Sequence, residues 1–362
     1  GNGVTVDGEG NYYVSLSTAY GGPESEVRGE LREAGLEFVR ESAVPYRGWV
    51  MRMAPDGETT PWAAGFRAPN GIANDTEGRV FVTDQQGEWV GTSPLYHIRE
   101  GHFYGFPSAL VWDDDVGSDA PELSARELDA MRTRATVQFP HGEVGVAPTG
   151  LAADTTDGGF GPFAGQLFVA DFAFPHVVRV ALDEVAGELQ GACVPSVAHG
   201  GRGAHRVAFG PGGDLWVGFT GRETNWQGGR GLKRLSWTGR TPFEVQRMEL
   251  TGEGFDLRFT KAVDAGRAAS ADAYEVTRYY YEYSRAYGSD KHDVTAVPVT
   301  DAAGSDDGRE VSLTLSDLRP GYVHALSVDG VESADGDSLA NPRVYYTLNR
   351  LLDGTTGNPQ FE

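Results

Sequence analysis

The sequence has little lysine, little cysteine and no long apolar run. Lys233, Lys261 and Lys291 are its only lysines, and its formal net charge is −22. Because binding to nucleic-acid phosphates needs a basic surface, this charge balance argues against nucleic acid as a partner. Cys193 is the only cysteine, which excludes a disulfide within the chain and a zinc site built on several cysteines. Without a run of about 18 apolar residues, no membrane-spanning helix is predicted.

Glycine and aromatic side chains are abundant instead. The 362 residues include 50 glycines, and 11% of the chain is Phe, Trp or Tyr. Glycine supplies the positive φ angles that tight turns need, and large side chains fill the space between stacked sheets. This composition is typical of an all-β protein.

One phrase recurs through the amino-terminal two thirds of the chain. Val4–Val14 reads VTVDGEGNYYV, Ile72–Val82 reads IANDTEGRVFV, and Val207–Val217 reads VAFGPGGDLWV. Leu151–Val169 carries the same phrase with an insertion. Each copy is a short apolar strand, a turn rich in Asp, Gly or Pro, and a β-branched or aromatic strand, which predicts a hairpin. Copies roughly 55 to 80 residues apart, with more strands between them, predict the blades of a β-propeller.

We therefore expect residues 1–247 to form a β-propeller of about four blades, with insertions near 16–45 and 108–147. The charged segments 24–38 and 120–135 within them fit short surface helices. Rings of this kind commonly have about six blades, so the predicted fold is a partial, N-terminally truncated six-bladed β-propeller. A compact four-bladed ring is the alternative.

The pattern changes after residue 247. Residues 248–350 alternate apolar and polar side chains, and turns fall at clusters of Gly, Asp and Pro. Roughly seven short strands in about 100 residues predict an immunoglobulin-like (Ig-like) β-sandwich, with Tyr279–Tyr283 in a half-buried strand. Residues 351–362 are rich in Gly, Pro and Asn, and we expect them to be a flexible tail.

Residues 65–107 carry the motif GFRAPNGI, then a strand, a turn, TDQQG and finally GHFYGFP. This series resembles the signature blade of the soluble quinoprotein glucose/sorbosone dehydrogenases. FAGQLFVAD and HRVAFGPGGDLWVG resemble the next two blades, so the resemblance covers most of residues 1–240. The C-terminal region resembles the Ig-like appendage of large secreted bacterial propeller proteins. A secreted or periplasmic location is therefore implied.

In this family, pyrroloquinoline quinone (PQQ) lies over the open end of the propeller, calcium polarises it, and a histidine takes the proton of the sugar hydroxyl. The resemblance implies that Arg67 contacts the quinone, because a guanidinium binds carboxylate oxygens bidentately. It also implies that the backbone carbonyls of Gln86 and Gly87 hold the calcium, since this ion prefers hard oxygen ligands. Asn70, on the same loop as Arg67, is a further candidate contact.

The chain departs from the family pattern at other positions. Ala68 stands where the family has an asparagine, and Ala173 stands near the place of a quinone-contacting lysine. A trianionic quinone needs concentrated positive charge, which alanine does not supply.

An arginine pair of the family is also shifted. Gly203 and His205 occupy its two places, and Arg202 and Arg206 lie one residue away, which makes these two arginines candidate cofactor contacts. The catalytic histidine of the family would fall about two residues before Gly1.

Two histidines within the chain are candidate general bases. His141 and His205 both precede predicted innermost strands, and an imidazole titrates near neutral pH. Asp84 and Asp171, at equivalent repeat positions, fit caps of the turns that follow them. Trp226, on a Gly-rich loop, fits either a sugar-stacking residue or a packing residue.

The leading prediction is a sugar-dehydrogenase-like propeller that oxidises an aldose or alcohol with PQQ and calcium and passes electrons to an acceptor protein. The alternative is a non-catalytic propeller and Ig-like module that binds a polysaccharide or a protein in a secreted assembly. Hydrolysis or isomerisation of a small ligand at the propeller mouth is a third option.

Overall fold

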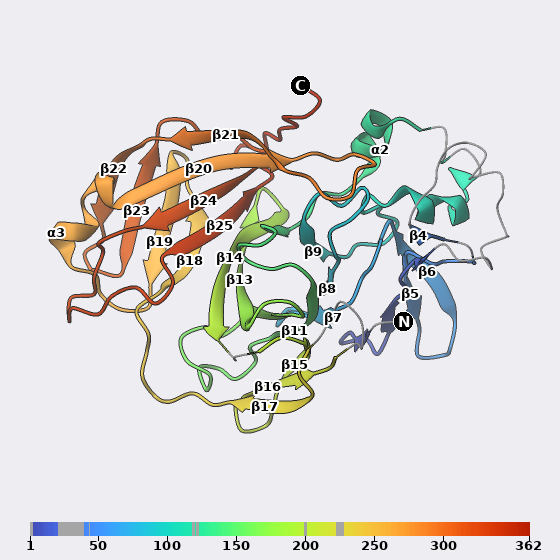
Figure 1. The fold of residues 1–362 in the computed structure, drawn as a ribbon, viewed down its shortest axis with the longest axis horizontal. Coiled ribbons are helices and arrows are strands. Elements are labelled where there is room, and N and C mark those ends of the chain that lie inside the picture. The colour runs from blue at the N-terminus through green and yellow to red at the C-terminus, as the bar shows by residue number, and fades with distance from the viewer. Residues whose placement is uncertain are drawn as a thin grey trace.

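The computed structural model describes residues 3–20, 40–42, 44–117, 120, 123–198, 201–221 and 228–362. The charged segment 24–38 and Trp226 lie outside these residues. The protein is all-β, as predicted, and its strands form several antiparallel sheets (Figure 1). Within the described ranges, no helix has the length and apolar character needed to cross a bilayer.

Four of the sheets contain the four sequence repeats, and we call them blades 1 to 4. Blade 1 consists of β1 (Val4–Val6), β2 (Tyr12–Ser15), β5 (Trp49–Met53) and β6 (Thr59–Ala64). Blade 2 consists of β7 (Ile72–Asn74), β8 (Val80–Thr83), β9 (Ser93–His97) and β10 (Val137–Phe139). Blade 3 begins with β11 (Pro148–Ala153), β12 (Leu167–Asp171), β13 (His176–Val185) and β14 (Glu188–Ala198). Blade 4 consists of β15 (Ala204–Phe209), β16 (Leu215–Phe219) and β17 (Gly231–Leu235).

Each repeat forms the first hairpin of its blade. The first and last residues of the phrase are paired across the hairpin in every blade: Val4 with Val14, Ile72 with Val82, Leu151 with Val169, and Val207 with Val217. The turn aspartates support this local fold, because Asp75 Oδ1 accepts the backbone N–H groups of Glu77 and Arg79, both at 2.9 Å. The hairpin prediction is confirmed.

The innermost strands of neighbouring blades approach closely, and glycine makes this approach possible. A Cβ atom on Gly71, just before β7, would lie 2.1 Å from the carbonyl oxygen of Thr149 on β11. A Cβ atom on Gly150 would lie 2.9 Å from Cα of Arg206 on β15. The blades therefore follow one another in an arc around a shared centre, from blade 1 at the right of Figure 1 to blade 4 at the bottom. This arrangement is that of a propeller; the number of blades in a complete ring stays a prediction.

Short helices and one small ribbon connect these sheets. The predicted helix in segment 120–135 is α2 (Ala125–Met131), which starts with a capping box between Ser124 and Glu127. Within the described residues, the other elements that precede the C-terminal region are the ribbon of β3 (Ala19–Tyr20) and β4 (Arg40–Glu41), and the 3₁₀ helix η2 (Pro107–Trp112).

Two further sheets follow blade 4 and enclose one apolar core that includes Phe255, Leu326 and Tyr346. One sheet consists of β18 (Val245–Leu250), β19 (Gly254–Phe259), β23 (Glu310–Leu315) and β22 (Val299–Gly304). The other consists of β25 (Arg343–Leu348), β24 (Tyr322–Val328), β20 (Tyr274–Tyr281) and β21 (Lys291–Val297). The helices α3 (Ala265–Ala268) and η4 (Ala271–Ala273) precede β20. The immunoglobulin-like assignment of this region stays a prediction.

The C-terminal region is joined to the propeller by strand pairing. β14 of blade 3 pairs with β25, with Gly191 opposite Thr347 and Cys193 opposite Tyr345, so that blade 3 continues into the second C-terminal sheet. The last residues return to the propeller as well, where Asn358 Nδ2 donates to the Asp129 carboxylate at 2.5 Å. The segment for which the sequence predicts a flexible tail thus has specific hydrogen-bond partners.

Candidate functional site

The loop that carries Arg67 is fixed by a buried aspartate at the end of β8. Asp84 Oδ2 accepts the backbone N–H of Arg67 at 2.8 Å, and its Oδ1 accepts those of Ala68 at 2.7 Å and Gln85 at 2.8 Å. Burial raises the pKa of the Asp84 carboxyl, and the three N–H groups oppose this rise. Asp171 holds the equivalent loop of blade 3 by accepting the N–H groups of Val146, Ala147, Ala173 and Phe174. Both aspartates therefore act as turn caps, as predicted.

The Arg67 side chain points into the protein. Its Nε donates to Glu88 Oε2 at 2.7 Å, and both side chains are buried. Its Nη1 donates to the carbonyl oxygen of Gln86 at 3.1 Å. The guanidinium lies against the backbone of Gly87, where an added Cβ atom would be 1.9 Å from Arg67 Cζ. Arg67 Cζ lies 5.1 Å from the ring centre of Tyr287. Glu88 thus neutralises the positive charge of Arg67, the residue that the family resemblance assigns to contact with a quinone.

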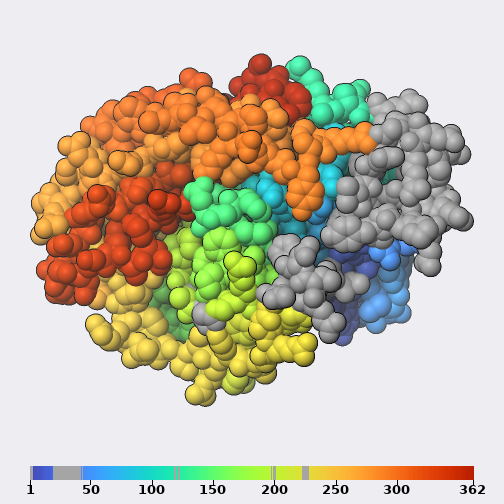
Figure 2. Space-filling view, in the orientation of Figure 1, coloured from blue at the N-terminus to red at the C-terminus, as the bar shows by residue number. Residues whose placement is uncertain are grey.

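Tyr287 belongs to the loop 282–290 between β20 and β21, which extends from the C-terminal region onto blade 2. Gly288 N donates to Gly87 O at 3.0 Å, Trp89 N donates to Ser284 O at 2.9 Å, and Ser289 N donates to Gly91 O at 2.9 Å. Figures 1 and 2 show this orange loop over the propeller segments in green and cyan. The loop covers the residues for which the sequence predicts a calcium site.

The carbonyls of Gln86 and Gly87 do not fit a calcium ion. The first accepts from the Arg67 guanidinium and the second from Gly288 N, so a cation placed there would displace one bond and face a positive charge. Across the part of the chain that the structure describes, no three His, Cys, Asp or Glu side chains form a group that can hold a metal.

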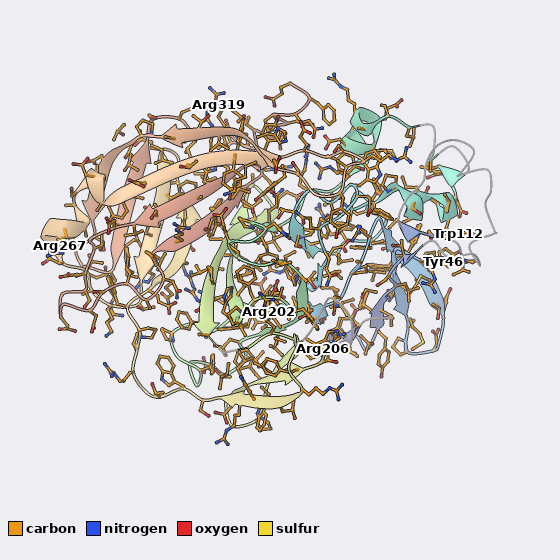
Figure 3. The ribbon with its side chains drawn as sticks, in the orientation of Figure 1. Tyr46, Trp112, Arg202, Arg206, Arg267 and Arg319 are labelled. Carbon is orange, nitrogen blue, oxygen red and sulfur yellow. The ribbon has the colours of Figure 1, made fainter. Side chains whose placement is uncertain are left out.

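The other candidate cofactor contacts do not gather around Arg67. Arg206 Nη1 donates to Asn70 Oδ1 at 2.8 Å and links the inner strand of blade 4 to the loop of blade 2, and burial lowers the pKa of Arg206. Arg202 is exposed and lines a separate hollow of about 340 Å³ with Arg230 and Lys233. Figure 3 labels Arg202 and Arg206, both on the blade 4 side of the propeller. The structure thus brings Asn70 and Arg206 together. Arg67 is paired with Glu88 instead, and Arg202 lines the separate hollow on blade 4.

The two candidate general bases, His141 and His205, lie on different blades. His205 is a half-buried residue of β15, next to Arg206. His141 is exposed in the turn between β10 and β11 and lines a cleft of about 390 Å³ together with Gln86, Tyr287 and Lys291. Partial burial lowers the pKa of His141, and the Asp171 carboxylate opposes this shift. The structure therefore places His141 and Gln86 in one cleft.

Glu88 and Tyr287 are the residues at this site that sequence reasoning missed. Glu88 lies in the motif TDQQGEWVG, so a carboxylate directly after the predicted calcium ligand Gly87 was a usable signal. Tyr287 comes from a region some 200 residues further along the chain, and no motif connects it with blade 2.

Comparison with known proteins agrees with the resemblance read from the motifs. Residues 50–227 match the family model described as Glucose / Sorbosone dehydrogenase. No curated protein is similar enough to be matched. An oxidoreductase (glucose dehydrogenase) structure from Thermus thermophilus shares 23% identity over 64% of this chain and 63% of its own, with a TM-score of 0.43. The PQQ-bound aldose sugar dehydrogenase of Streptomyces coelicolor shares 18% identity over 64% and 60%, with a TM-score of 0.38.

The chain thus spans less than two thirds of the length of these solved structures. Its blades and its signature loop nevertheless lie within the residues that the family model matches, apart from the first strands of blade 1 and the last strand of blade 4. The predicted resemblance is confirmed: this chain contains a sugar-dehydrogenase-like β-propeller that matches the glucose/sorbosone dehydrogenase family.

Proposed function

We propose that this protein is a non-catalytic, sugar-dehydrogenase-like propeller module that binds carbohydrate in a secreted or periplasmic setting. The observation that carries this proposal is the buried ion pair of Arg67 with Glu88 beneath Tyr287 and Gly288. Arg67, Gln86 and Gly87, to which the family resemblance assigns quinone and calcium, are here engaged with one another and with the loop 282–290.

The cleft beside this loop has the chemistry of a sugar-binding surface. Tyr287 is 65% exposed, and an exposed ring offers a face on which the C–H groups of a pyranose pack. Gln86, His141, Asp290 and Lys291 line the same cleft and supply donors and acceptors for hydroxyl groups. Lys291 also pairs with Glu143 and lies 4.1 Å from the ring centre of Tyr279, which holds it at the edge of the cleft.

A glycan array with the full chain, followed by calorimetry on the best ligand, tests this function. Tyr287→Ala is expected to weaken binding at least tenfold, while Tyr287→Phe retains the ring face and most of the affinity. A thermal melt of each variant separates loss of binding from loss of folding. Absence of any glycan ligand, or binding that Tyr287→Ala leaves unchanged, would overturn the proposal.

PQQ-dependent oxidation of an aldose or alcohol is the second candidate, and the family match over residues 50–227 favours it. This activity requires the loop 282–290 to move away from Gln86 and Gly87, and it requires Arg67 to break its ion pair with Glu88. Asn70, Arg202 and Arg206 would be further quinone contacts. Dye reduction with a sugar, PQQ and calcium, lost in His141→Ala or His205→Ala, would support this function. An electron-acceptor protein would then be its partner.

A further inference from the structure

A cavity of about 600 Å³ lies between blade 2 and the C-terminal region. The propeller side includes Tyr96 on β9 and the segment that follows α2, and the opposite side includes Tyr281 on β20 and Asn349 after β25. Among the described residues, the cavity shares only Tyr281 with the cleft that contains Tyr287 and Lys291, so the two are separate places on the molecule. Its volume falls within the range of sites that hold small molecules.

Two arginines on the propeller side of the cavity share one buried carboxylate. Arg132 Nε donates to Asp129 Oδ1 at 2.7 Å, and Arg134 Nη2 donates to Asp129 Oδ2 at 2.9 Å. Only 1% of the Asp129 side chain is exposed, so a single buried negative charge faces two guanidinium groups. Burial and the charge of Arg132 lower the pKa of Arg134 to about 10, and Asp129 opposes this shift. This wall of the cavity therefore carries a surplus of positive charge.

Arg350 adds a third guanidinium group to the same cavity. Asn349 Nδ2 donates to the carbonyl oxygen of Ala135 at 2.8 Å, which brings the chain at Arg350 next to the segment of Arg134. In the part of the chain that the structure describes, the Arg350 side chain has no hydrogen-bond or ion-pair partner, and Arg134 has none at Nε and Nη1. Both guanidinium groups thus keep N–H donors for a ligand.

The carboxylates that line the cavity elsewhere are either paired or partly open to solvent. Glu188 Oε1 accepts from Arg99 Nη1 at 2.9 Å, and Glu362 Oε1 accepts a backbone N–H at 2.6 Å. The Glu282 side chain is 41% exposed and lies 3.6 Å from His292. These carboxylates have other partners or are screened by water, so the surplus of positive charge on the propeller side remains.

Two uncharged donors at the cavity also lack a partner within the described residues. Tyr96 is 4% exposed; its ring packs against Phe66 and Tyr104, and its hydroxyl has no hydrogen-bond partner. Trp89 is 8% exposed, and its buried Nε1 has no acceptor. A buried donor without an acceptor is costly, so these side chains indicate a ligand that presents several oxygen atoms.

We propose that this cavity binds a sugar acid, with the carboxylate of the ligand on Arg134 and Arg350. The planar fork of N–H groups in a guanidinium matches the two oxygens of a carboxylate. The oxygens of the sugar accept from the Tyr96 hydroxyl, and the half-buried Tyr281 ring gives the sugar ring an apolar face. An inorganic anion would fill only a small part of about 600 Å³. This inference does not rest on the function proposed above, because it concerns another cavity.

Calorimetric titration of the full chain with D-glucuronate tests the proposal, and D-glucose is the matched neutral ligand. Glucuronate is expected to bind, and glucose is expected to bind about tenfold more weakly because it lacks the carboxylate. The Tyr287→Ala chain is expected to bind glucuronate as tightly as the wild type does. A failure of carbohydrate binding at the cleft of Tyr287 would therefore leave this result unchanged.

Three variants locate the site of binding. Arg134→Gln and Arg350→Gln are each expected to weaken glucuronate binding about tenfold, and Tyr96→Phe is expected to weaken it roughly threefold, because a hydrogen bond to a charged group is stronger than a neutral one. Arg350→Gln removes a side chain that has no partner among the described residues, so this variant is expected to keep the melting temperature of the wild type.

Arg247→Gln is the control variant. Arg247 is an exposed arginine of β18 outside the cavity, so its replacement changes the net charge by the same amount and should leave the affinity for glucuronate unchanged. Absence of glucuronate binding by the wild type would overturn the proposal, and so would equal affinities for glucuronate and glucose. Binding that is lost in Tyr287→Ala but kept in Arg134→Gln and Arg350→Gln would place the ligand in the other cleft and contradict it.

Discussion

Arg67 Nε lies 2.7 Å from Glu88 Oε2, and both side chains are buried beneath the loop 282–290. The pair occupies the place where the glucose/sorbosone dehydrogenase resemblance implies a cofactor, and it links the signature blade to the C-terminal region through Tyr287. The same arginine that the family resemblance assigns to a ligand therefore has an internal partner here.

Removing the carboxylate of this pair should destabilise the protein strongly. Glu88→Gln leaves the Arg67 guanidinium buried without a counter-charge, a change that costs about 3–5 kcal/mol in comparable buried pairs. Urea unfolding followed by tryptophan fluorescence measures the loss. Glu58→Gln, in an exposed turn of blade 1, is the control and should change stability by less than about 0.5 kcal/mol. Equal stability of the two variants would contradict the structural role of the pair.

The contact of the loop 282–290 with blade 2 can be loosened at Gly87. A Cβ atom there would lie 1.9 Å from Arg67 Cζ, so Gly87→Ala should displace the guanidinium and expose the loop. Faster amide hydrogen exchange at Trp89, Gly288 and Ser289 is the expected result, because these three N–H groups donate across the contact. Gly8→Ala is the control, because a Cβ on Gly8 meets no atom within 4 Å. Unchanged exchange in Gly87→Ala would show that the loop is held by other contacts.

Replacing Asp84 should lower the free energy of unfolding more than replacing an exposed aspartate. Asp84→Ala removes the acceptor of three N–H groups, two of them buried, and each buried group left unsatisfied costs about 1–3 kcal/mol. Thermal unfolding should show a large drop in the melting temperature, and Asp171→Ala should give a drop of similar size because Asp171 accepts four N–H groups in blade 3. A drop in only one variant would contradict their equivalence.

The C-terminal sheets should lose stability in mild acid through His324. This fully buried side chain packs against Phe255, and burial lowers its pKa to about 3 from an ordinary value of about 6.5. Between these two values the unfolded state binds a proton that the folded state does not, so stability is full above about pH 6.5 and falls as the pH decreases. His324→Leu should reduce the slope of the unfolding free energy against pH between about pH 6.5 and 4.5. An unchanged slope would contradict a neutral, buried His324.

The hairpins and the order of the blades could be predicted from sequence because their signals are local. Val4 pairs with Val14 and Ile72 with Val82 through turns that the residues between them specify. The joint between β14 and β25 had no such signal, since Cys193 and Tyr345 are far apart in the chain and any exposed strand edge is a chemically similar partner.

The site was predictable in position but not in the direction of its side chains. The motif GFRAPNGI placed Arg67 on the loop before β7, and Asp84 holds that loop as expected. The direction of the guanidinium depends on Glu88, which competes for it within the same blade, and on Tyr287, which arrives from the C-terminal region. Only the folded arrangement brings these three side chains together.

Titration of the full chain with PQQ in the presence of calcium, followed by calorimetry, tests most directly whether the Arg67–Glu88 pair and the loop 282–290 close the family's cofactor position. Our account predicts no binding heat and no rise in melting temperature for the wild type. Stoichiometric binding of PQQ that requires calcium and is lost in Arg67→Ala would contradict it.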